Sequence, residues 1–438
     1  MRIEAKPLDF TSLESPLDTF LGPSFRDPTP FVQAKKQIDS RSFPRAHIAK
    51  ILEKYNSELG VNAVSLENVQ RLALPNSYCV VTGQQLGMMG GPAYTILKAL
   101  SCLLVARHTG AIPIFWLATE DHDIHEIDHT YLIDELGNLK RFHLSMEKSG
   151  FAVEDLKLTS KNIEEMESFW RHLGLDKHPL PSSGELYSRS MIEVLVSLFA
   201  GTGLVFLEPK LLRPLAVPFF SKEIQACEQI RDVLNETTKA LVEAGGEANI
   251  LVGEPTNLFL KDKTNKRKKI RPEGDAFIAG SEKYSLKELL AKIENEPEAF
   301  SPNVSARPVL QNTLLPVIAY VAGPAEFAYH RQLGAYHAFH EAAMPYIIPR
   351  LSATFIPPEA TLLLKSCKLE PWNEIPLHRN GIQGRDLHVL RNLIYPHQGP
   401  QERLLNWWGF QAKSRENLVK ECLAQLSWDS NSSYYVYL

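Results

Sequence analysis

Acidic and histidine side chains crowd one short stretch, EDHDIHEIDH, which runs from Glu120 to His129. The stretch directly follows the apolar run IPIFWLAT, which predicts a buried β-strand. Clustered carboxylates and imidazoles can hold a substrate amine or a ribose hydroxyl, and they can take a proton from an attacking amine. The candidate catalytic residues are Asp121, His122 and Asp123, and the candidate binding residues of the stretch are Glu120, Glu126 and His129.

Two other interpretations of this stretch are open. Asp and Glu are common in the first turn of a helix, so capping and a solvated helix face would explain part of the run. If a helix begins here, His122, Glu126 and His129 share one of its faces. The same residue types would suit a metal ion, but this is the least favoured interpretation and no metal ligands are predicted.

A glycine-rich loop follows an earlier apolar strand, in the run VTGQQLGMMGGPAYTILKAL. A helix that starts after such a loop presents unpaired N–H groups to a phosphate or carboxylate, and glutamine amides can read the hydrogen-bonding edge of a ligand. Neither GxxxxGK[ST] nor GxGxxG is present, so plain helix capping is the alternative. The candidate binding residues here are Gln84, Gln85, Gly90, Gly91, Tyr94 and Lys98.

Two further apolar runs stop at polar residues. LLPVIAYVAGPAEFAYH repeats the order of strand, Gly-Pro corner and helix, and YIIP is followed by arginine. Ligands bind beyond the carboxyl ends of parallel strands, so we expect these ends to line one crevice. Arginine there suits bidentate binding of phosphate or carboxylate. The candidate binding residues of this half are Arg307, Gln311, Gly323, Glu326, Tyr329 and Arg350.

The composition excludes several classes of protein. The chain has 438 residues and a net charge of -4, which gives no reason to expect a nucleic-acid partner. No apolar run is long enough to span a bilayer, and the opening MRIEAK is not a signal peptide. The five cysteines are scattered without a CxxC pair, as in proteins with reduced thiols. We therefore expect a cytoplasmic protein with neither nucleic-acid nor membrane partners.

The order of strand, loop, helix and strand over residues 77–144 predicts an α/β fold with a parallel sheet. We expect helices at 46–59, 216–244 and 401–426, strands at 204–207 and 251–260, and a frayed tail at 432–438. The basic run 261–271 predicts a solvated hairpin or loop, and the alternative is a mobile loop that closes on an anionic substrate. The expected units are an N-terminal helical and loop segment (1–75), the first half of the core (76–150), a connecting insertion (151–300), the second half of the core (301–360) and a shortened C-terminal helical region (361–438).

Taken together, several motifs resemble the cysteine ligases of bacillithiol biosynthesis, the BshC family. They are VTGQQLGMMGGPAYTILKAL, PIFWLATEDHDIHEIDH, LVFLEPKLLRPLAVPFFSKEI, the stretch from SPNVSARPVLQ to VAGPAEFAYHRQL, MPYIIPRLSAT and GPQERLLN. The resemblance implies a Rossmann-like parallel-sheet core with connecting-peptide insertions and an inserted helical coiled coil. It also implies that cysteine is joined to glucosaminyl malate. ATP is the expected energy source, the part of magnesium is open, and no tightly bound metal or organic cofactor is expected.

The sequence departs from the family pattern in two places. The family's GPGE is GPAE here, with Ala325, and its YW is Tyr329-His330. Residues 365–388 contain Pro371, Pro376 and Gly381, which cannot form a long heptad helix. We therefore expect a reduced C-terminal helical part without the coiled coil, and a monomer or weak dimer.

The resulting hypothesis is an ATP-activated carboxyl group, as acyl-adenylate or acyl-phosphate, attacked by the amine of glucosamine. The glycine loop would hold nucleotide or anion, the carboxylate cluster would hold the amine or take its proton, and Lys98, Arg307 and Arg350 would bind phosphate or malate carboxylates. Two alternatives are a non-catalytic descendant that binds a nucleotide or sugar acid, and a nucleotidylyltransferase-type enzyme acting on another small acid.

Overall fold

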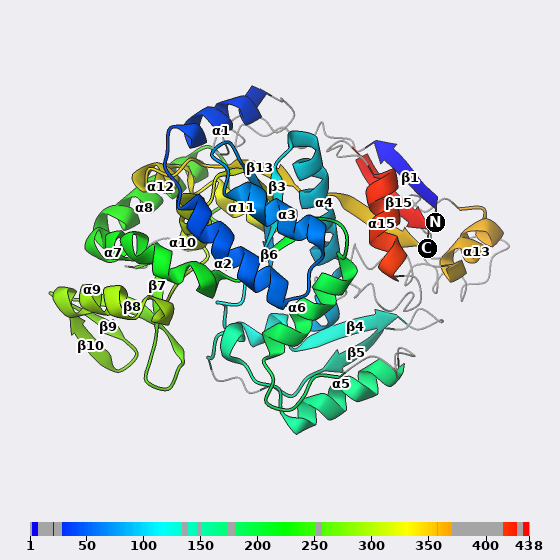
Figure 1. Cartoon of the computed structure of the whole chain (residues 1–438), viewed down its shortest axis with the longest axis horizontal. Helices are drawn as coiled ribbons and strands as arrows, with labels where there is room; N and C mark the ends of the chain where they lie inside the picture. Colours follow the sequence, from blue (N-terminus) through cyan, green and yellow to red (C-terminus); the bar gives the residue numbers. More distant parts are fainter. Residues whose placement is uncertain are drawn as a thin grey trace.

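The fold is built around a five-stranded parallel sheet. A computed structural model describes residues 2–7, 21, 29–133, 139–146, 150–172, 180–250, 256–356, 358–369, 415–426 and 432–437. The strand order in the central sheet is β13-β12-β2-β3-β6, and Figure 1 labels β13, β3 and β6 among the surrounding helices. The bounds are β2 Cys79–Gln84, β3 Ile112–Leu117, β6 Val205–Leu207, β12 Val317–Ala322 and β13 Tyr346–Pro349. The predicted α/β class with a parallel sheet is confirmed.

The central strands are apolar on both faces because helices cover both. β3 and β12 are buried along their whole length, as parallel strands usually are. One core cluster joins the sheet to α4, α6 and α15, and the other joins it to α2, α3, α7, α8 and α10. The bounds are α2 Arg45–Glu58, α3 Ala63–Leu72, α4 Ala93–Thr109, α6 Tyr187–Leu198, α7 Val217–Gln225, α8 Cys227–Glu243, α10 Ala306–Leu314 and α15 Arg415–Gln425.

Shorter elements continue the chain around this core. A third cluster packs α1 against β12 and β13. After β12 the chain forms two short helices before it returns to β13. The bounds are α1 Thr29–Asp39, α5 Ser160–His172, α11 Pro324–His330 and α12 Gly334–Phe339, with 3-10 turns η3 Met88–Gly90, η4 Ile124–Glu126, η5 Val153–Asp155, η6 Pro209–Ala216 and η7 Pro297–Ala299. A two-stranded ribbon is formed by β4 His129–Ile133 and β5 Leu139–His143.

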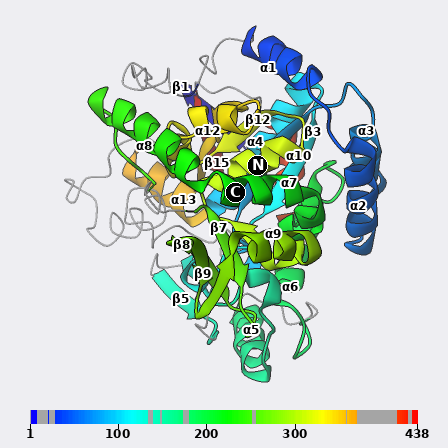
Figure 2. The ribbon, with the colours of Figure 1, turned by 90° about the vertical axis from the view of Figure 1, so that its left-hand side faces the viewer.

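The basic run 261–271 belongs to an antiparallel sheet of order β10-β9-β8-β7-β11 (Figure 2). β7 and β8 form a hairpin whose turn is closed by the Asp262 side chain, which accepts from the Thr264 and Lys266 amides. The predicted hairpin is therefore correct, but the expected strand at 251–260 begins only at Leu258, and residues 251–255 lie outside the described residues. The bounds are β7 Leu258–Lys261, β8 Arg267–Glu273, β9 Ala276–Ala279, β10 Glu282–Ser285, β11 Phe300–Pro302 and α9 Leu286–Asn295.

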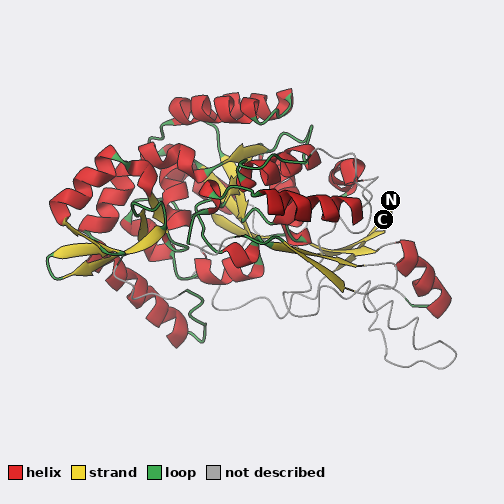
Figure 3. Cartoon of the chain, turned by 90° about the horizontal axis from the view of Figure 1, so that it is seen from below, coloured by secondary structure: helices red, strands yellow, loops and turns green. Residues whose placement is uncertain are grey.

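The expected frayed tail at 432–438 is wrong. Residues of the tail form β15 (Ser432–Tyr437), which lies between β1 (Arg2–Pro7) and β14 (Ser352–Ile356) in a separate three-stranded sheet. The run SSYYVY is rich in residues that favour strands, and two distant segments supply its partners. Figure 3 shows these strands and the β7–β10 sheet at opposite ends of the molecule.

The remaining described element near the C-terminus is α13 (Pro358–Cys367), and α15 covers only part of the helix expected at 401–426. Residues 370–414 lie outside the described residues, and with them most of the segment expected to lack a coiled coil. No helix in the described ranges is both long and apolar enough to cross a membrane.

Candidate functional site

Four strand ends meet at one edge of the central sheet. β2, β3, β12 and β13 run parallel in adjacent positions, so Gln84, Leu117, Ala322 and Pro349 end at the same side. The backbone amide of Arg350 donates to the carbonyl of Ala322 at 2.8 Å, which fixes the fourth end against the third. The predicted arrangement of the polar stops along one edge is therefore found.

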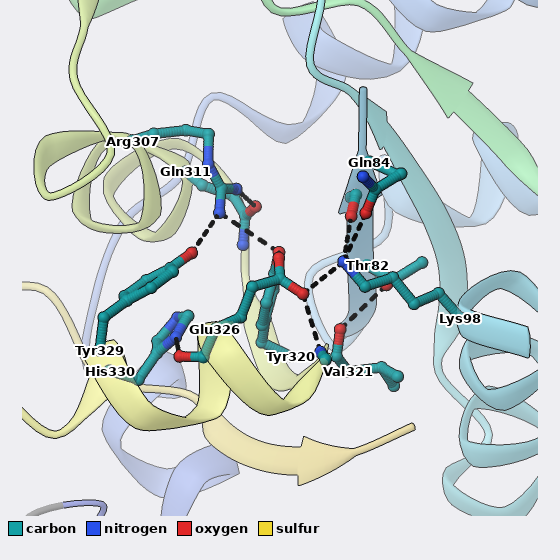
Figure 4. A network of polar contacts seen from close by, with 12 residues as sticks. Thr82, Gln84, Lys98, Arg307, Gln311, Tyr320, Val321, Glu326, Tyr329 and His330 are labelled. Atoms are coloured by element: carbon teal, nitrogen blue, oxygen red, sulfur yellow. Dashed lines mark hydrogen bonds and ion pairs between the residues drawn. The ribbon is translucent and has the colours of Figure 1, made fainter. Parts of the chain in front are cut away.

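Lys98 joins the ends of β2 and β12 (Figure 4). Its ammonium donates to the Gly83 carbonyl at 2.9 Å and to Gln84 Oε1 at 2.8 Å, and it forms an ion pair with Glu326 Oε2. An ammonium has three N–H donors, and these three acceptors use all of them. Burial lowers the pKa of Lys98, although the charge of Glu326 opposes this shift. Lys98 is therefore a buried link, not the solvent-facing lysine of a helix surface.

Glu326 is held on several sides. Its Oε1 accepts from the Tyr320 hydroxyl at 2.7 Å and its Oε2 accepts from the Gly323 amide at 2.8 Å. Burial favours its neutral form, but the Lys98 ammonium and these donors outweigh burial and lower the pKa of Glu326. Because Glu326 caps α11 itself, the Gly323 amide is not available to a ligand anion.

Arg307 carries a positive charge, and all its hydrogen-bond partners are neutral side chains. Its Nη2 donates to the hydroxyls of Tyr320 and Tyr329, both at 3.2 Å, and its Nη1 lies 3.5 Å from Gln311 Oε1 (Figure 4). Among the residues that the structure describes, no carboxylate forms an ion pair with it. The guanidinium can therefore accept an anionic ligand without giving up an existing ion pair.

Arg350 is the second such arginine. Its Nη1 donates to the Leu351 carbonyl at 3.0 Å, and its guanidinium lies 5.9 Å from the centre of the Tyr94 ring. Burial lowers the pKa of Arg350 and raises that of Tyr94 to about 12, so Tyr94 keeps its proton. Within the described chain Arg350 also has no ion-pair partner. The edge thus presents two arginines that lack an acidic partner.

Asp121 connects the acidic stretch to the glycine loop. Gln85 Nε2 donates to Asp121 Oδ2 at 2.6 Å, and the His122 amide donates to Asp121 Oδ1 at 2.7 Å. Burial alone would raise the pKa of Asp121, but its contacts with His122 and the charge of Arg267 lower it to about 2. Asp121 is consequently a carboxylate at any physiological pH and a weak base.

Two other carboxyl groups of the stretch behave differently. Glu120 is buried; its Oε1 accepts from Trp116 Nε1 at 3.3 Å, and its Oε2 has no partner among the described residues. Burial raises the pKa of Glu120. Loss of hydration, together with the charges of Asp123 and Asp121, raises the pKa of Glu126 as well. Glu126 is exposed, so it is the better placed of the two to exchange a proton with a ligand.

The helix expected after β3 does not form. Asp123 instead caps the single 3-10 turn η4 by accepting from the His125 amide at 3.0 Å, and His129 begins β4. His122, Glu126 and His129 therefore do not share a helix face. His129 Nδ1 lies 2.9 Å from Asp128 Oδ1, whose other oxygen lies 3.2 Å from His143 Nε2.

Residues 125–129, HEIDH, match the zinc-binding pattern H-E-x-x-H, although no metal ligands are predicted from the sequence. The pattern binds zinc when its two histidines lie one turn apart on a helix. Here the segment is a 3-10 turn followed by a strand. No group of three or more histidine, cysteine or acidic side chains in the described ranges is arranged to hold a metal ion.

The glycine loop owes its shape to its glycines. Gly90 and Gly91 have φ of +90° and +74°, and a Cβ on Gly87 would lie 2.6 Å from the Gly91 Cα. Side chains are disfavoured at such positions, so this loop conformation requires glycine there. Pro92 is the N-cap residue of α4.

Two residues of the site were not expected from the sequence. Tyr320 lies within a wholly apolar strand, and nothing in the local pattern marks its hydroxyl as a partner of Glu326 and Arg307. Arg267 lies in the basic run, yet its side chain is only 5% exposed and contacts Asp121 and His122. Burial along β8 does not alternate, so the period of two that marks a half-buried strand would not have separated Arg267 from Lys269 and Arg271.

Comparison with known proteins gives matches that include the residues of this site. Residues 7–351 match the sequence model of "Bacillithiol biosynthesis BshC, N-terminal Rossmann-like domain". Proteins named "putative cysteine ligase BshC" are similar: 36% identical over 344 residues in Koribacter versatilis and 30% over 351 residues in Bacillus cytotoxicus, each match covering 74% of this chain and 64% of the relative. In Heliobacterium modesticaldum the identity is 32% over 390 residues, covering 81% of this chain and 69% of the relative. The chain thus spans just under two thirds of the length of the first two relatives.

Proposed function

Because the chain belongs to the BshC family of bacillithiol biosynthesis, we propose that it joins the carboxyl group of L-cysteine to the amino group of glucosaminyl malate. The observation that carries this proposal is the pairing of opposite chemistries at one sheet edge. Arg307 and Arg350 lack acidic ion-pair partners in the described chain, and Asp121 and Glu126 follow β3, which ends at the same edge as β13 with β12 and β2 between them. A substrate that spans this edge can therefore present an anionic group to the arginines and an amine to the carboxylates.

Amide formation requires an activated acyl group. ATP supplies this in the proposed reaction, giving a cysteinyl-adenylate with release of pyrophosphate or a cysteinyl-phosphate with release of ADP. The glucosamine nitrogen then attacks the acyl carbon, the C–N bond forms, and AMP or phosphate leaves. The attacking nitrogen loses a proton, which needs a base within the site.

Glu126 suits the part of that base better than Asp121. A general base works best when its pKa lies near the working pH, and the pKa of Glu126 is raised whereas that of Asp121 is about 2. Asp121 instead suits the binding of the amine in its ammonium form before the proton is lost. Asp123 raises the pKa of Glu126 through its charge. From the sequence, Asp121, His122 and Asp123 were expected to bind the amine and accept its proton, whereas in the proposed reaction Glu126 accepts the proton.

Arg307 and Arg350 are the proposed binding groups for the malate carboxylates or the phosphates. Lys98 was expected to share this role, but all three of its donors are engaged. We assign Lys98 to positioning: it holds Gln84 and Glu326, and Glu326 in turn holds Tyr320 beside Arg307.

The glycine loop is the proposed nucleotide contact. Gln84 Oε1 accepts from Lys98, which leaves its Nε2 donor for a ligand, and Gln85 Oε1 has no partner in the described part of the chain. The start of α4 follows directly, and helix N-termini favour anions.

A direct test is to incubate the purified protein with glucosaminyl malate, L-cysteine and Mg-ATP and to measure bacillithiol by mass spectrometry. The product should form only when all three are present, and L-serine or L-alanine should not replace cysteine. Formation of product with Arg307→Met should be much slower. Failure to form bacillithiol, under conditions in which a full-length relative forms it, would overturn the proposal, and turnover with other acids would favour a nucleotidylyltransferase.

A further inference from the structure

The guanidinium of Arg267 is fixed by groups outside the acidic stretch. Its Nε donates to Ser301 Oγ at 2.9 Å and its Nη2 to the Pro302 carbonyl at 2.5 Å. Its planar group lies 3.8 Å from the centre of the Phe259 ring. These contacts come from β11 and β7, so the antiparallel sheet sets the direction in which the third guanidinium nitrogen, Nη1, points.

That donor faces His122. Nη1 lies 3.0 Å from His122 Nδ1 and 3.6 Å from Asp121 Oδ1, so the shorter contact is the hydrogen bond. A guanidinium nitrogen can only donate. Nδ1 must therefore accept with its lone pair, and the proton of the neutral ring is on Nε2. The other arrangement, with Nδ1–H directed at Asp121 Oδ1 at 3.5 Å, would place two donors 3.0 Å apart.

We propose that Arg267 is a positioning residue that holds His122 in its Nε2–H tautomer, so that His122 donates a hydrogen bond to the acyl oxygen during the reaction and does not accept the proton of the amine. The consequence for the reaction rests on the proposed function, whereas the tautomer is a property of the free protein. Nε2 has no partner among the described residues, so it is available to a ligand.

The proposed role has a chemical reason. As the amine attacks, the acyl oxygen gains negative charge, and a preorganised N–H donor stabilises that charge. A neutral ring with its proton on Nε2 supplies the donor but has no lone pair on that nitrogen to act as base. His122 and Glu126 then have separate tasks, since Glu126 takes the proton.

The test reads the tautomer by NMR, without turnover. Protein labelled with ¹⁵N-histidine is measured at a pH where histidines are neutral, and His122 is assigned from the signal that disappears in His122→Gln. We expect Nδ1 to show the shift of an unprotonated nitrogen and Nε2 that of an N–H. In Arg267→Met the two shifts should move toward each other as the tautomers mix. A protonated Nδ1 in the unaltered protein would overturn the inference, whether or not the variant folds.

Matched variants separate positioning from folding. Arg271→Met removes an exposed arginine of the same strand and should leave the His122 signals unchanged. In the ligase assay, Arg267→Met should lower kcat about tenfold to a hundredfold, with a smaller change in KM. Combined with His122→Gln, it should add no further loss. Additive losses in the double variant, or a His122 tautomer unaffected by Arg267→Met, would show that Arg267 is only structural; absence of ligase activity with the expected tautomer would instead count against the proposed function alone.

Discussion

Lys98 and Glu326 form a buried ion pair that joins the helix after β2 to the helix after β12. Their side chains are 4% and 18% exposed, and the same ammonium also holds Gly83 and Gln84. The glycine loop and the Tyr320–Arg307 network are therefore parts of one hydrogen-bonded unit. Lys98 and Glu326 therefore hold both the candidate anion site at Arg307 and the candidate nucleotide loop in place.

Removing the ammonium should destabilise the protein strongly. Lys98→Met leaves the Glu326 carboxylate buried without its partner, and such a loss costs about 3 to 5 kcal/mol of the free energy of unfolding. Lys54→Met is the control, because Lys54 and Glu58 form an exposed pair at 4.0 Å whose loss should cost less than about 0.5 kcal/mol. Urea unfolding measures both values. Equal small losses would show that the buried pair does not hold the site together.

Arg307 should control affinity for the anionic substrate. Arg307→Met removes charged hydrogen bonds to that substrate, each worth about 1.5 to 3 kcal/mol, so kcat/KM should fall about tenfold or more. Tyr329→Phe keeps the guanidinium and its Tyr320 contact, so the fall should be smaller. Arg231→Met, on the surface of α8, serves as control. A KM for glucosaminyl malate that is unchanged in Arg307→Met would contradict the assignment.

The fall of kcat/KM at low pH should follow the protonation of Glu126. The base acts as carboxylate, so kcat/KM should fall as the pH drops through the raised pKa of Glu126. Asp123→Asn removes a negative neighbour and lowers that pKa, so the fall should move to lower pH; asparagine still accepts from the His125 amide. Glu126→Gln should reduce kcat about a hundredfold or more. If kcat/KM fell at the same pH in Asp123→Asn as in the unaltered protein, a residue other than Glu126 would be the base.

His330 should make stability depend on pH. It is fully buried, its Nδ1–H donates to the Glu326 carbonyl at 2.7 Å, and burial lowers its pKa to about 4. The unfolded chain, with an ordinary pKa near 6.5, binds the proton first as the pH falls, so stability is lost from about pH 6.5 down to about pH 4. Between pH 7 and pH 5 this loss is about 2 kcal/mol.

The variant His330→Gln should therefore lose about 2 kcal/mol less than the unaltered protein over the same pH interval, as measured by urea unfolding. His47→Gln, at an exposed position on α2, is the control and should lose as much as the unaltered protein does. The same loss in His330→Gln and His47→Gln would mean that other buried groups cause the pH dependence.

Much of the site's location could be predicted because it depends on local pattern. Apolar runs that stop at polar residues indicated the strand ends, and parallel pairing brought Gln84, Asp121, Glu326 and Arg350 to one edge, as expected. Arg307 also lies where its predicted role requires, although its tyrosine partners come from β12 and α11.

The remainder depends on contacts between distant segments, which periodicity does not encode. From the sequence alone, Lys98, one turn from Tyr94, would be interpreted as solvent-facing. Only the fold places Glu326 beside it. From the sequence, Arg267 is one charge in a run that is expected to be solvated. In the fold, β11 and Phe259 enclose its side chain. The tail reads as frayed because its strand partners, β1 and β14, are remote in sequence.

The most direct test of the account is a crystal structure of the protein with glucosaminyl malate and a non-hydrolysable ATP analogue. We predict that the malate carboxylates contact Arg307 and Arg350 and that the glucosamine nitrogen lies beside Asp121 and Glu126. A ligand bound instead in the cavity of about 490 Å³ between α1 and α12, with both arginines untouched, would contradict it.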